Sequence, residues 1–151
     1  MSNNSNEAGD TAYLESFGLT IYLDKKQHIG TIVLMKIIAD TNTFLAVALY
    51  EPEREKIIRL TLGHDLVAPD ILPFEIGNAL SAMLKRKRIQ PEELLPVWDV
   101  TQQIPVDLRS VNIREALKTA SKFNIYAYDA YFIECAISLH CPLITLDQRM
   151  I

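Results

Sequence analysis

The feature that most constrains the fold of this chain is a regular alternation of short apolar runs with longer segments. From residue 35 onward, apolar runs at residues 37–39, 66–68, 104–106 and 143–146 are separated by stretches long enough to hold helices. Strands that alternate with helices pair in parallel, and the helices cover the sheet. The sequence therefore predicts an α/β fold with a parallel sheet, in which Pro105 places its strand at an edge or makes it short.

Capping residues and prolines mark where the helices should begin. Asn42 or Thr43 can cap a helix that runs through Tyr50, because short polar side chains accept hydrogen bonds from free backbone amides. Prolines favour the first turn of a helix, where their missing amide costs nothing. On these signals and on apolar spacing, the expected helices lie at residues 42–50, 73–88, from 91 onward, 111–118 and 130–139.

Length and composition indicate one ordinary domain with an extension in front of it. We expect residues 1–34 to form an N-terminal extension, with 1–10 disordered and a hairpin within 19–34, and residues 35–151 to form the domain. The net charge of -4 provides no global basic field, so any nucleic-acid site must be local. Two cysteines without metal or disulfide spacing, and no apolar run of membrane-spanning length, predict a cytoplasmic protein with no membrane contact.

Four acidic residues occupy positions that the predicted fold brings to one rim. Asp40 and Asp147 directly follow the apolar runs 37–39 and 143–146, and in open parallel sheets the carboxyl ends of strands border the ligand crevice. Glu75 follows Pro73 at the start of one helix, and Asp129 opens another. Each acid alone is explained about twice as well by an ordinary helix cap, turn or first-turn anion.

Taken together, four carboxylates at one rim require relief from their mutual repulsion. A hard divalent cation provides it, and an all-oxygen ligand set suits Mg²⁺ or Mn²⁺. The four acids in a strand–helix alternation therefore favour a metal site.

The ordered motifs resemble those of PIN-domain ribonucleases of the kind found as toxins in VapBC-type toxin-antitoxin pairs. The matching stretches lie at residues 37–42, 75–78, 128–131 and 143–147, and the likeness covers about three quarters of the chain. It implies a three-layer αβα architecture with a central mostly parallel sheet. Because family members usually continue beyond the last aspartate, we expect this sheet to lack the family's usual last strand.

The resemblance also implies a function and a set of site residues. Asp40, Glu75, Asp129 and Asp147 would be the catalytic and metal-binding acids, holding one or two Mg²⁺ or Mn²⁺ ions for hydrolysis of RNA phosphodiester bonds. Asn42, Asn78 and Thr145 would support these acids. An ordinary helix cap at Asn42 and a β-branched strand residue at Thr145 explain those two residues about equally well. The expected partners are RNA, a cognate antitoxin and a second copy of the chain in a homodimer.

Two further sequence features could contact RNA. One basic run could bind RNA phosphates or an acidic antitoxin segment, and a solvated helix end explains it equally well; it consists of Lys85, Arg86, Lys87 and Arg88. Four aromatic residues could stack on bases, although packing in the core or in a dimer is the better interpretation; they are Trp98, Tyr126, Tyr128 and Tyr131.

Two alternative functions stay open. A catalytically weak PIN scaffold could act as a protein- or RNA-binding module. The segment from Asp40 to Thr43 also resembles the nucleophile loop of haloacid dehalogenase-type phosphatases, but Asn42 stands where their second aspartate would protonate the leaving group.

Overall fold

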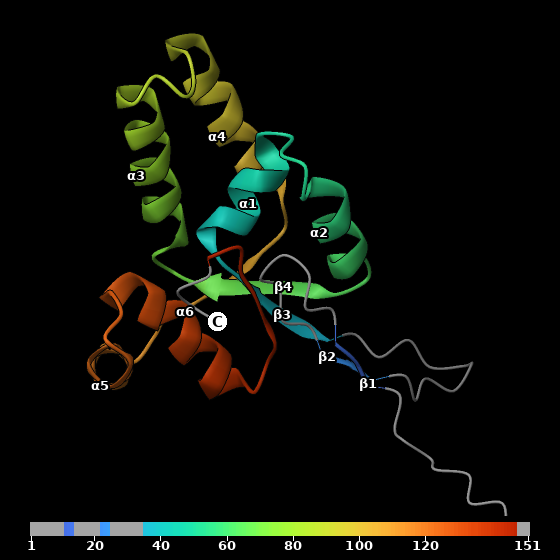
Figure 1. Ribbon diagram of the computed structural model, residues 1–151, viewed down its shortest axis with the longest axis vertical. Coiled ribbons are helices and arrows are strands. Elements are labelled where there is room, and N and C mark those ends of the chain that lie inside the picture. The colour runs from blue at the N-terminus through green and yellow to red at the C-terminus, as the bar shows by residue number, and fades with distance from the viewer. Residues whose placement is uncertain (1–10, 14–21, 25–34, 148–151) are drawn as a thin grey trace, which may run out of the picture.

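A four-stranded parallel sheet forms the centre of the molecule. The structure is a computed structural model, which describes residues 11–13, 22–24 and 35–147. The strand order in this sheet is β5-β4-β3-β6, and every neighbouring pair is parallel (Figure 1). The strands are β3 (Lys36–Ala39), β4 (Asp65–Pro69), β5 (Asp107–Arg109) and β6 (Leu143–Ile144).

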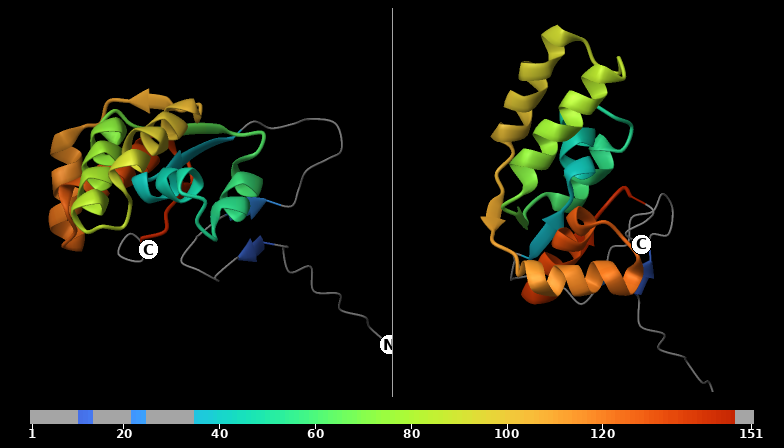
Figure 2. Two further views of the ribbon diagram at one scale, coloured as in Figure 1. Left: turned by 90° about the horizontal axis from the view of Figure 1, so that it is seen from above. Right: turned by 90° about the vertical axis from the view of Figure 1, so that its left-hand side faces the viewer.

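Helices cover both faces of this sheet. On one side lie α1 (Thr41–Ala48), α2 (Arg54–Thr61), α3 (Leu72–Lys85) and α4 (Leu94–Gln103), the last preceded by a 3₁₀ turn at Pro91–Glu93. On the other side lie α5 (Ile113–Phe123) and α6 (Ala127–Leu139) (Figures 1 and 2). This arrangement confirms the predicted α/β fold with three layers and a parallel central sheet.

The core forms where the two helical layers meet the sheet. Ile38 and Val67 are fully buried at the centre of β3 and β4, which explains why these runs are almost wholly apolar. One face of α3, at Leu72, Ile76 and Leu80, packs from one side, and Phe132 with Cys135 packs from the other. The spacing of four between the α3 residues is the helical repeat that puts them on one face.

The register of β3 and β6 determines what lies beside Asp40. Ile38 pairs with Leu143 and Ala39 pairs with Ile144. The same register places the next residues of the two chains, Asp40 and Thr145, side by side. The backbone amide of Asp40 donates to the carbonyl of Ile144 over 3.2 Å, which holds the two strand ends together. A residue 105 positions away in sequence thus becomes a direct neighbour of Asp40.

Strand β5 differs from the sequence prediction. It lies at Asp107–Arg109 rather than at residues 104–106, because Ile104 is the C-cap of α4. It is the edge strand expected from Pro105, and its three residues are exposed. An exposed edge strand has no apolar pattern to reveal it.

Two helix predictions also need correction. Asp40, and neither Asn42 nor Thr43, is the N-cap of α1, with its side chain accepting from the Thr43 amide. Helix α2 has no counterpart in the prediction, because Ile57 is its only buried residue and its apolar stripe is narrow.

The segment before residue 35 is described in two short pieces. Strand β2 (Tyr22–Asp24) pairs antiparallel with β1 (Thr11–Tyr13). The disorder expected at residues 1–10 and the second expected strand at 31–34 lie outside the described residues. In the described part of the chain, no helix is long and apolar enough to span a membrane.

Candidate functional site

The four predicted acids line one pocket beyond the carboxyl ends of β3 and β6. This cavity of about 190 Å³ is bordered by residues from the starts of α1, α3 and α6 and from the segment after β6. Three helix starts and two strand ends meet at this corner of the sheet (Figure 1). The lining residues are Asp40, Thr41, Asn42, Glu75, Asn78, Ala79, Asp129, Phe132 and Asp147.

Asp40 is held by three hydrogen bonds. Its Oδ1 accepts hydrogen bonds from the Thr43 amide at 2.8 Å and from the Thr43 hydroxyl at 2.7 Å, and its Oδ2 accepts from the Thr145 hydroxyl at 2.6 Å. The residue is only 4% exposed. These three donors fix the carboxylate in one orientation.

Thr145 links Asp40 to Asp147. Its hydroxyl donates to Asp40 and accepts from the backbone amide of Asp147 over 2.9 Å. One buried hydroxyl therefore sets the position of the Asp40 carboxylate and of the chain that carries Asp147. The supporting contact expected for Thr145 is present. Among the described hydrogen bonds, the other side chain that donates to Asp40 is the hydroxyl of Thr43 rather than the amide of Asn42.

Glu75 is held by Thr41, which is not among the site residues predicted from sequence. The Thr41 hydroxyl donates to Glu75 Oε2 over 2.7 Å. Thr41 directly follows Asp40, so the first residue of α1 connects two acids that are 35 positions apart. The sequence does carry a sign of both contacts: directly after Asp40, threonines at positions 41 and 43 flank Asn42, and their hydroxyl groups can donate to nearby carboxylates.

Burial and like charge act together on the buried acids. Desolvation raises the pKa of Asp40 above its usual range and the charge of Asp147 adds to this, while hydrogen bonds from Thr145 and Thr43 oppose it. Desolvation also raises the pKa of Glu75, opposed by the Thr41 hydrogen bond and reinforced by the charges of Asp129 and Asp40. The acids therefore interact with one another across the pocket.

Helix N-termini compensate part of this negative charge. Asp40 caps α1, Glu75 lies in the first turn of α3, and Asp129 lies in the first turn of α6. The free amides and the dipole at a helix N-terminus favour an anion, typically by about 0.3–1 kcal/mol each. Three such ends pointing at one cavity make a cluster of carboxylates tolerable in the folded chain.

The chemistry of the lining fits a hydrated divalent cation. Carboxylate, amide and hydroxyl oxygens are the ligands that Mg²⁺ and Mn²⁺ take. Within the described residues, no group of three or more His, Cys, Asp or Glu side chains lies close enough together to hold a metal ion directly. Mg²⁺ needs only one or two direct carboxylates when water and substrate phosphates complete its shell. The pocket therefore suits an ion that keeps most of its water.

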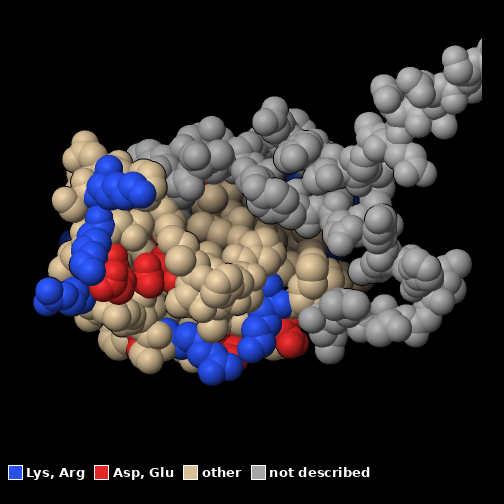
Figure 3. Space-filling view, turned by 90° about the horizontal axis from the view of Figure 1, so that it is seen from below, with Lys and Arg blue, Asp and Glu red and all other residues tan. Residues whose placement is uncertain are grey.

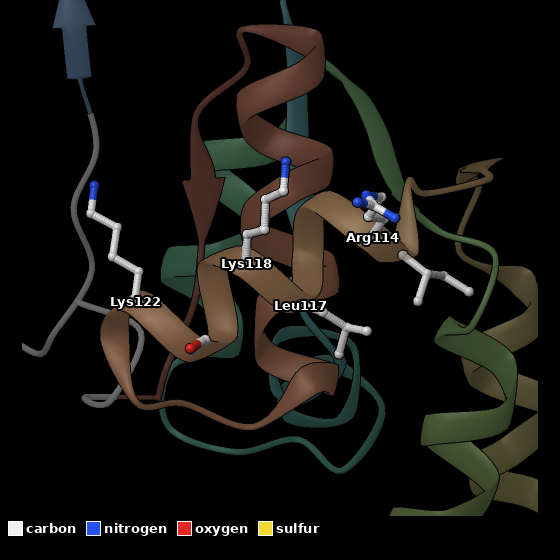
Figure 4. Close-up of a pocket in the computed structure, with 6 residues that line it drawn as sticks. Arg114, Leu117, Lys118 and Lys122 are labelled. Carbon is white, nitrogen blue, oxygen red and sulfur yellow. The ribbon is translucent and has the colours of Figure 1, made fainter.

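A second hollow, on α5, has the opposite chemistry. Arg114, Lys118 and Lys122 project from successive turns of that helix beside Leu117 (Figure 4). Seen from the side of α5 and α6, basic side chains gather along the left and lower margins of the molecule, with acidic side chains beside them (Figure 3). The described lining of this hollow contains no carboxylate, so it suits an anion rather than a metal.

The basic run predicted to contact RNA or an antitoxin does not reach the acidic pocket. Lys85 is the last residue of α3, and ten residues of helix, about 15 Å, separate it from Glu75. The whole run is exposed around the end of that helix. Any contact that these cations make lies at a distance from the acids.

Comparison with known proteins places these features in a family. The family model described as "PIN domain" matches residues 37–151. A curated protein named Ribonuclease VapC3, from Pyrobaculum aerophilum, is 23% identical over 121 residues, which cover 77% of this chain and 92% of that protein. The crystal structure of PAE2754 from Pyrobaculum aerophilum superposes with a TM-score of 0.60 at 21% identity, covering 78% of this chain and 85% of that one. This chain belongs to the PIN domain family.

Proposed function

We propose that this protein is a divalent-metal-dependent endoribonuclease whose catalytic acids are Asp40, Glu75, Asp129 and Asp147. The observation that carries the proposal is that these four acids, from distant parts of the chain, line one pocket at the strand ends of a PIN fold. The name of the relative, a ribonuclease, supports RNA as the substrate. Membership in this family leaves the phosphatase alternative without support.

The four acids would hold one or two Mg²⁺ or Mn²⁺ ions. A divalent ion bound there supplies a polarised water for attack on phosphorus and charge stabilisation for the leaving oxygen. The residues of the chain position the acids: Thr43 and Thr145 orient Asp40, and Thr41 orients Glu75. Asn42 and Asn78 present amide groups at the pocket edge, where they can hydrogen-bond a phosphate oxygen.

The relative's name also supports a biological context. We propose that the protein is the toxin of a toxin-antitoxin pair and is held inactive by a cognate antitoxin. That it forms a homodimer and acts in the cytoplasm is proposed from the sequence alone. Residues 35–151 would carry the activity, and residues 1–34 would be an added segment. Lys85, Arg86, Lys87 and Arg88 stay candidates for RNA or antitoxin contact.

Cleavage of a labelled single-stranded RNA oligonucleotide tests the proposed activity. Cleavage should require Mg²⁺ or Mn²⁺, stop with a chelator, and fall at least about 100-fold in each of Asp40→Asn, Glu75→Gln, Asp129→Asn and Asp147→Asn. Asp65→Asn is the matched control, because Asp65 is an exposed acid at the opposite end of β4. A protein that binds RNA or an antitoxin but cleaves nothing with either metal would instead be the catalytically weak scaffold.

A further inference from the structure

Two large aromatic side chains stand exposed beside the acidic pocket. Phe74 is 74% exposed and directly precedes Glu75, and Tyr128 is 52% exposed and directly precedes Asp129. Of the two packing roles expected for Tyr128, in the core or in a dimer, its exposure rules out the core. Rings of this size usually bury most of their surface in the folded protein or in a complex.

Helix geometry places both rings at the rim of this pocket. Phe74 and Asn78 are four residues apart on α3, and Tyr128 and Phe132 are four residues apart on α6, so each pair is adjacent on its helix surface. Asn78 and Phe132 line the pocket. Helices α3 and α6 belong to opposite helical layers (Figure 1), so Phe74 and Tyr128 approach the acids from different layers.

The ring of Tyr128 is also held in place by a neighbour. Its centroid lies 5.8 Å from that of Tyr131, with the ring planes at 89° in an edge-to-face contact. Edge-to-face aromatic contacts of this kind are favourable beyond the area they bury. The contact leaves the ring of Tyr128 exposed, so its flat apolar face is accessible to a ligand.

We propose that Phe74 and Tyr128 are stacking platforms for unpaired bases of the RNA, one on each side of the phosphate in the acidic pocket. This inference rests on the proposed ribonuclease function and adds two residues that position the substrate, whose unpaired bases can turn outward onto the rings. Stacking accepts any base, since every base has a π face, so these residues select unpaired over paired RNA rather than one sequence.

The chemistry between the rings favours RNA over a protein partner. The pocket between them is lined mostly by polar and acidic residues, among them Glu75, Asp129 and Asn78, with Ala79 and Phe132 as its apolar members. The buried core of a protein interface is depleted in charged residues. Alternating flat rings and cation-binding acids instead match the alternating bases and phosphates of a nucleic acid.

Binding of a fluorescent ten-residue oligouridylate to the Asp147→Asn protein in Mg²⁺, followed by anisotropy, tests the platforms with cleavage suppressed and the proposed metal ligands Asp40 and Glu75 intact. Phe74→Ala and Tyr128→Ala should each weaken binding about tenfold. Tyr128→Phe, which keeps the ring, should bind as the parent does. Tyr50→Ala is the matched control, because Tyr50 is also 74% exposed but lies beyond the far end of α1.

An oligonucleotide that lacks bases tests the contact itself. Removing the bases should weaken binding to the parent protein, and should have no further effect on the Phe74→Ala/Tyr128→Ala double variant. Equal binding of intact, abasic and double-stranded RNA by the parent would overturn the proposal, as would platform variants that behave like Tyr50→Ala. A change in sedimentation mass with unchanged RNA binding would mean that the rings form a dimer contact instead.

The proposed activity and this inference fail in different ways. If the unsubstituted protein cleaves no RNA with either metal, the ribonuclease function fails. If it cleaves RNA but the Phe74 and Tyr128 variants retain the parent KM, only the stacking inference fails. Melting temperatures of the variants should match the parent, because both side chains are exposed.

Discussion

Asp40 is a buried carboxylate whose position depends on two threonine side chains. Thr43 comes from the same helix start, whereas Thr145 comes from the far end of the sequence. A hydrogen bond to a charged group contributes about 1.5–3 kcal/mol, and losing it leaves a buried oxygen without its donor. The two threonines therefore both stabilise the fold locally and orient the acid.

Replacing Thr145 with valine tests this positioning role. Thr145→Val keeps the shape of a buried strand residue but removes the donor to Asp40 and the acceptor for the Asp147 amide. We expect the free energy of unfolding to fall by about 1–3 kcal/mol and RNA cleavage to fall with it. Thr145→Ser, which retains the hydroxyl, should restore most of both. Chemical denaturation and the cleavage assay measure the two effects, and an active valine variant would contradict the role.

The raised pKa of Asp40 gives a pH dependence with a definite sign. Burial raises the pKa of Asp40, so near that pKa the metal-free folded protein binds more protons than the unfolded chain. The contribution of Asp40 to the free energy of unfolding is fully present below the pKa of this group in the unfolded chain, which is about 4. It is lost as pH rises through the higher pKa of Asp40 in the folded protein.

Melting temperatures in a chelator, measured from pH 4 to pH 8, check this dependence. As pH rises through that window, the melting temperature of Asp40→Asn should rise relative to that of the unsubstituted protein. Asp65→Asn, an exposed acid, should show no such trend. Parallel pH profiles for Asp40→Asn and the parent would contradict the burial argument.

At the scale of elements, the pocket is built from the ends of helices and strands. Helices α1, α3 and α6 all begin at this corner of the sheet, and each brings an acid in its cap or first turn. Helix α3 is anchored by its buried face, while its other face is exposed around Gly77. Gly77 is therefore a place where helix propensity can be changed without disturbing the core.

Gly77→Ala should stabilise the protein. Nothing lies within 4 Å of the methyl group that alanine would add, and alanine is favoured over glycine in a helix by up to about 1 kcal/mol. Gly63→Ala is the matched control: its surroundings are equally open, but its φ of +79° is a backbone conformation that strains alanine. Denaturation should show a gain for the first variant and a loss for the second. A loss for both would mean that α3 is not the exposed helix described.

The elements that the sequence predicted well are those with strong apolar patterns. After an exposed charged first residue, strands β3 and β4 become buried and their remaining residues are apolar. Strand β5 and helix α2 have mostly exposed or half-exposed residues, and their formation depends on tertiary contacts that no local pattern reveals. The N-cap of α1 was misplaced because Asp40, Asn42 and Thr43 are all good capping residues.

At the scale of the whole molecule, the fold brings together residues from across more than one hundred positions. The sequence predicted which acids lie at strand ends and helix starts, because those positions follow from the order of elements. It could not predict that Thr41 and Thr43 contact those acids, since these contacts depend on helix orientation and side-chain rotamers. The same limit applies to the exposed rings of Phe74 and Tyr128.

The proposed ribonuclease activity depends most on a divalent ion that binds among these four carboxylates. Crystals soaked in Mn²⁺, with data collected near the manganese absorption edge, test this directly. We predict an anomalous peak within coordination distance of Asp40 and at least one of Glu75, Asp129 and Asp147, and its loss in Asp40→Asn crystals. Cleavage of RNA in Mn²⁺ by a protein whose soaked crystals show no peak in this pocket, or a peak elsewhere, would contradict the central claim.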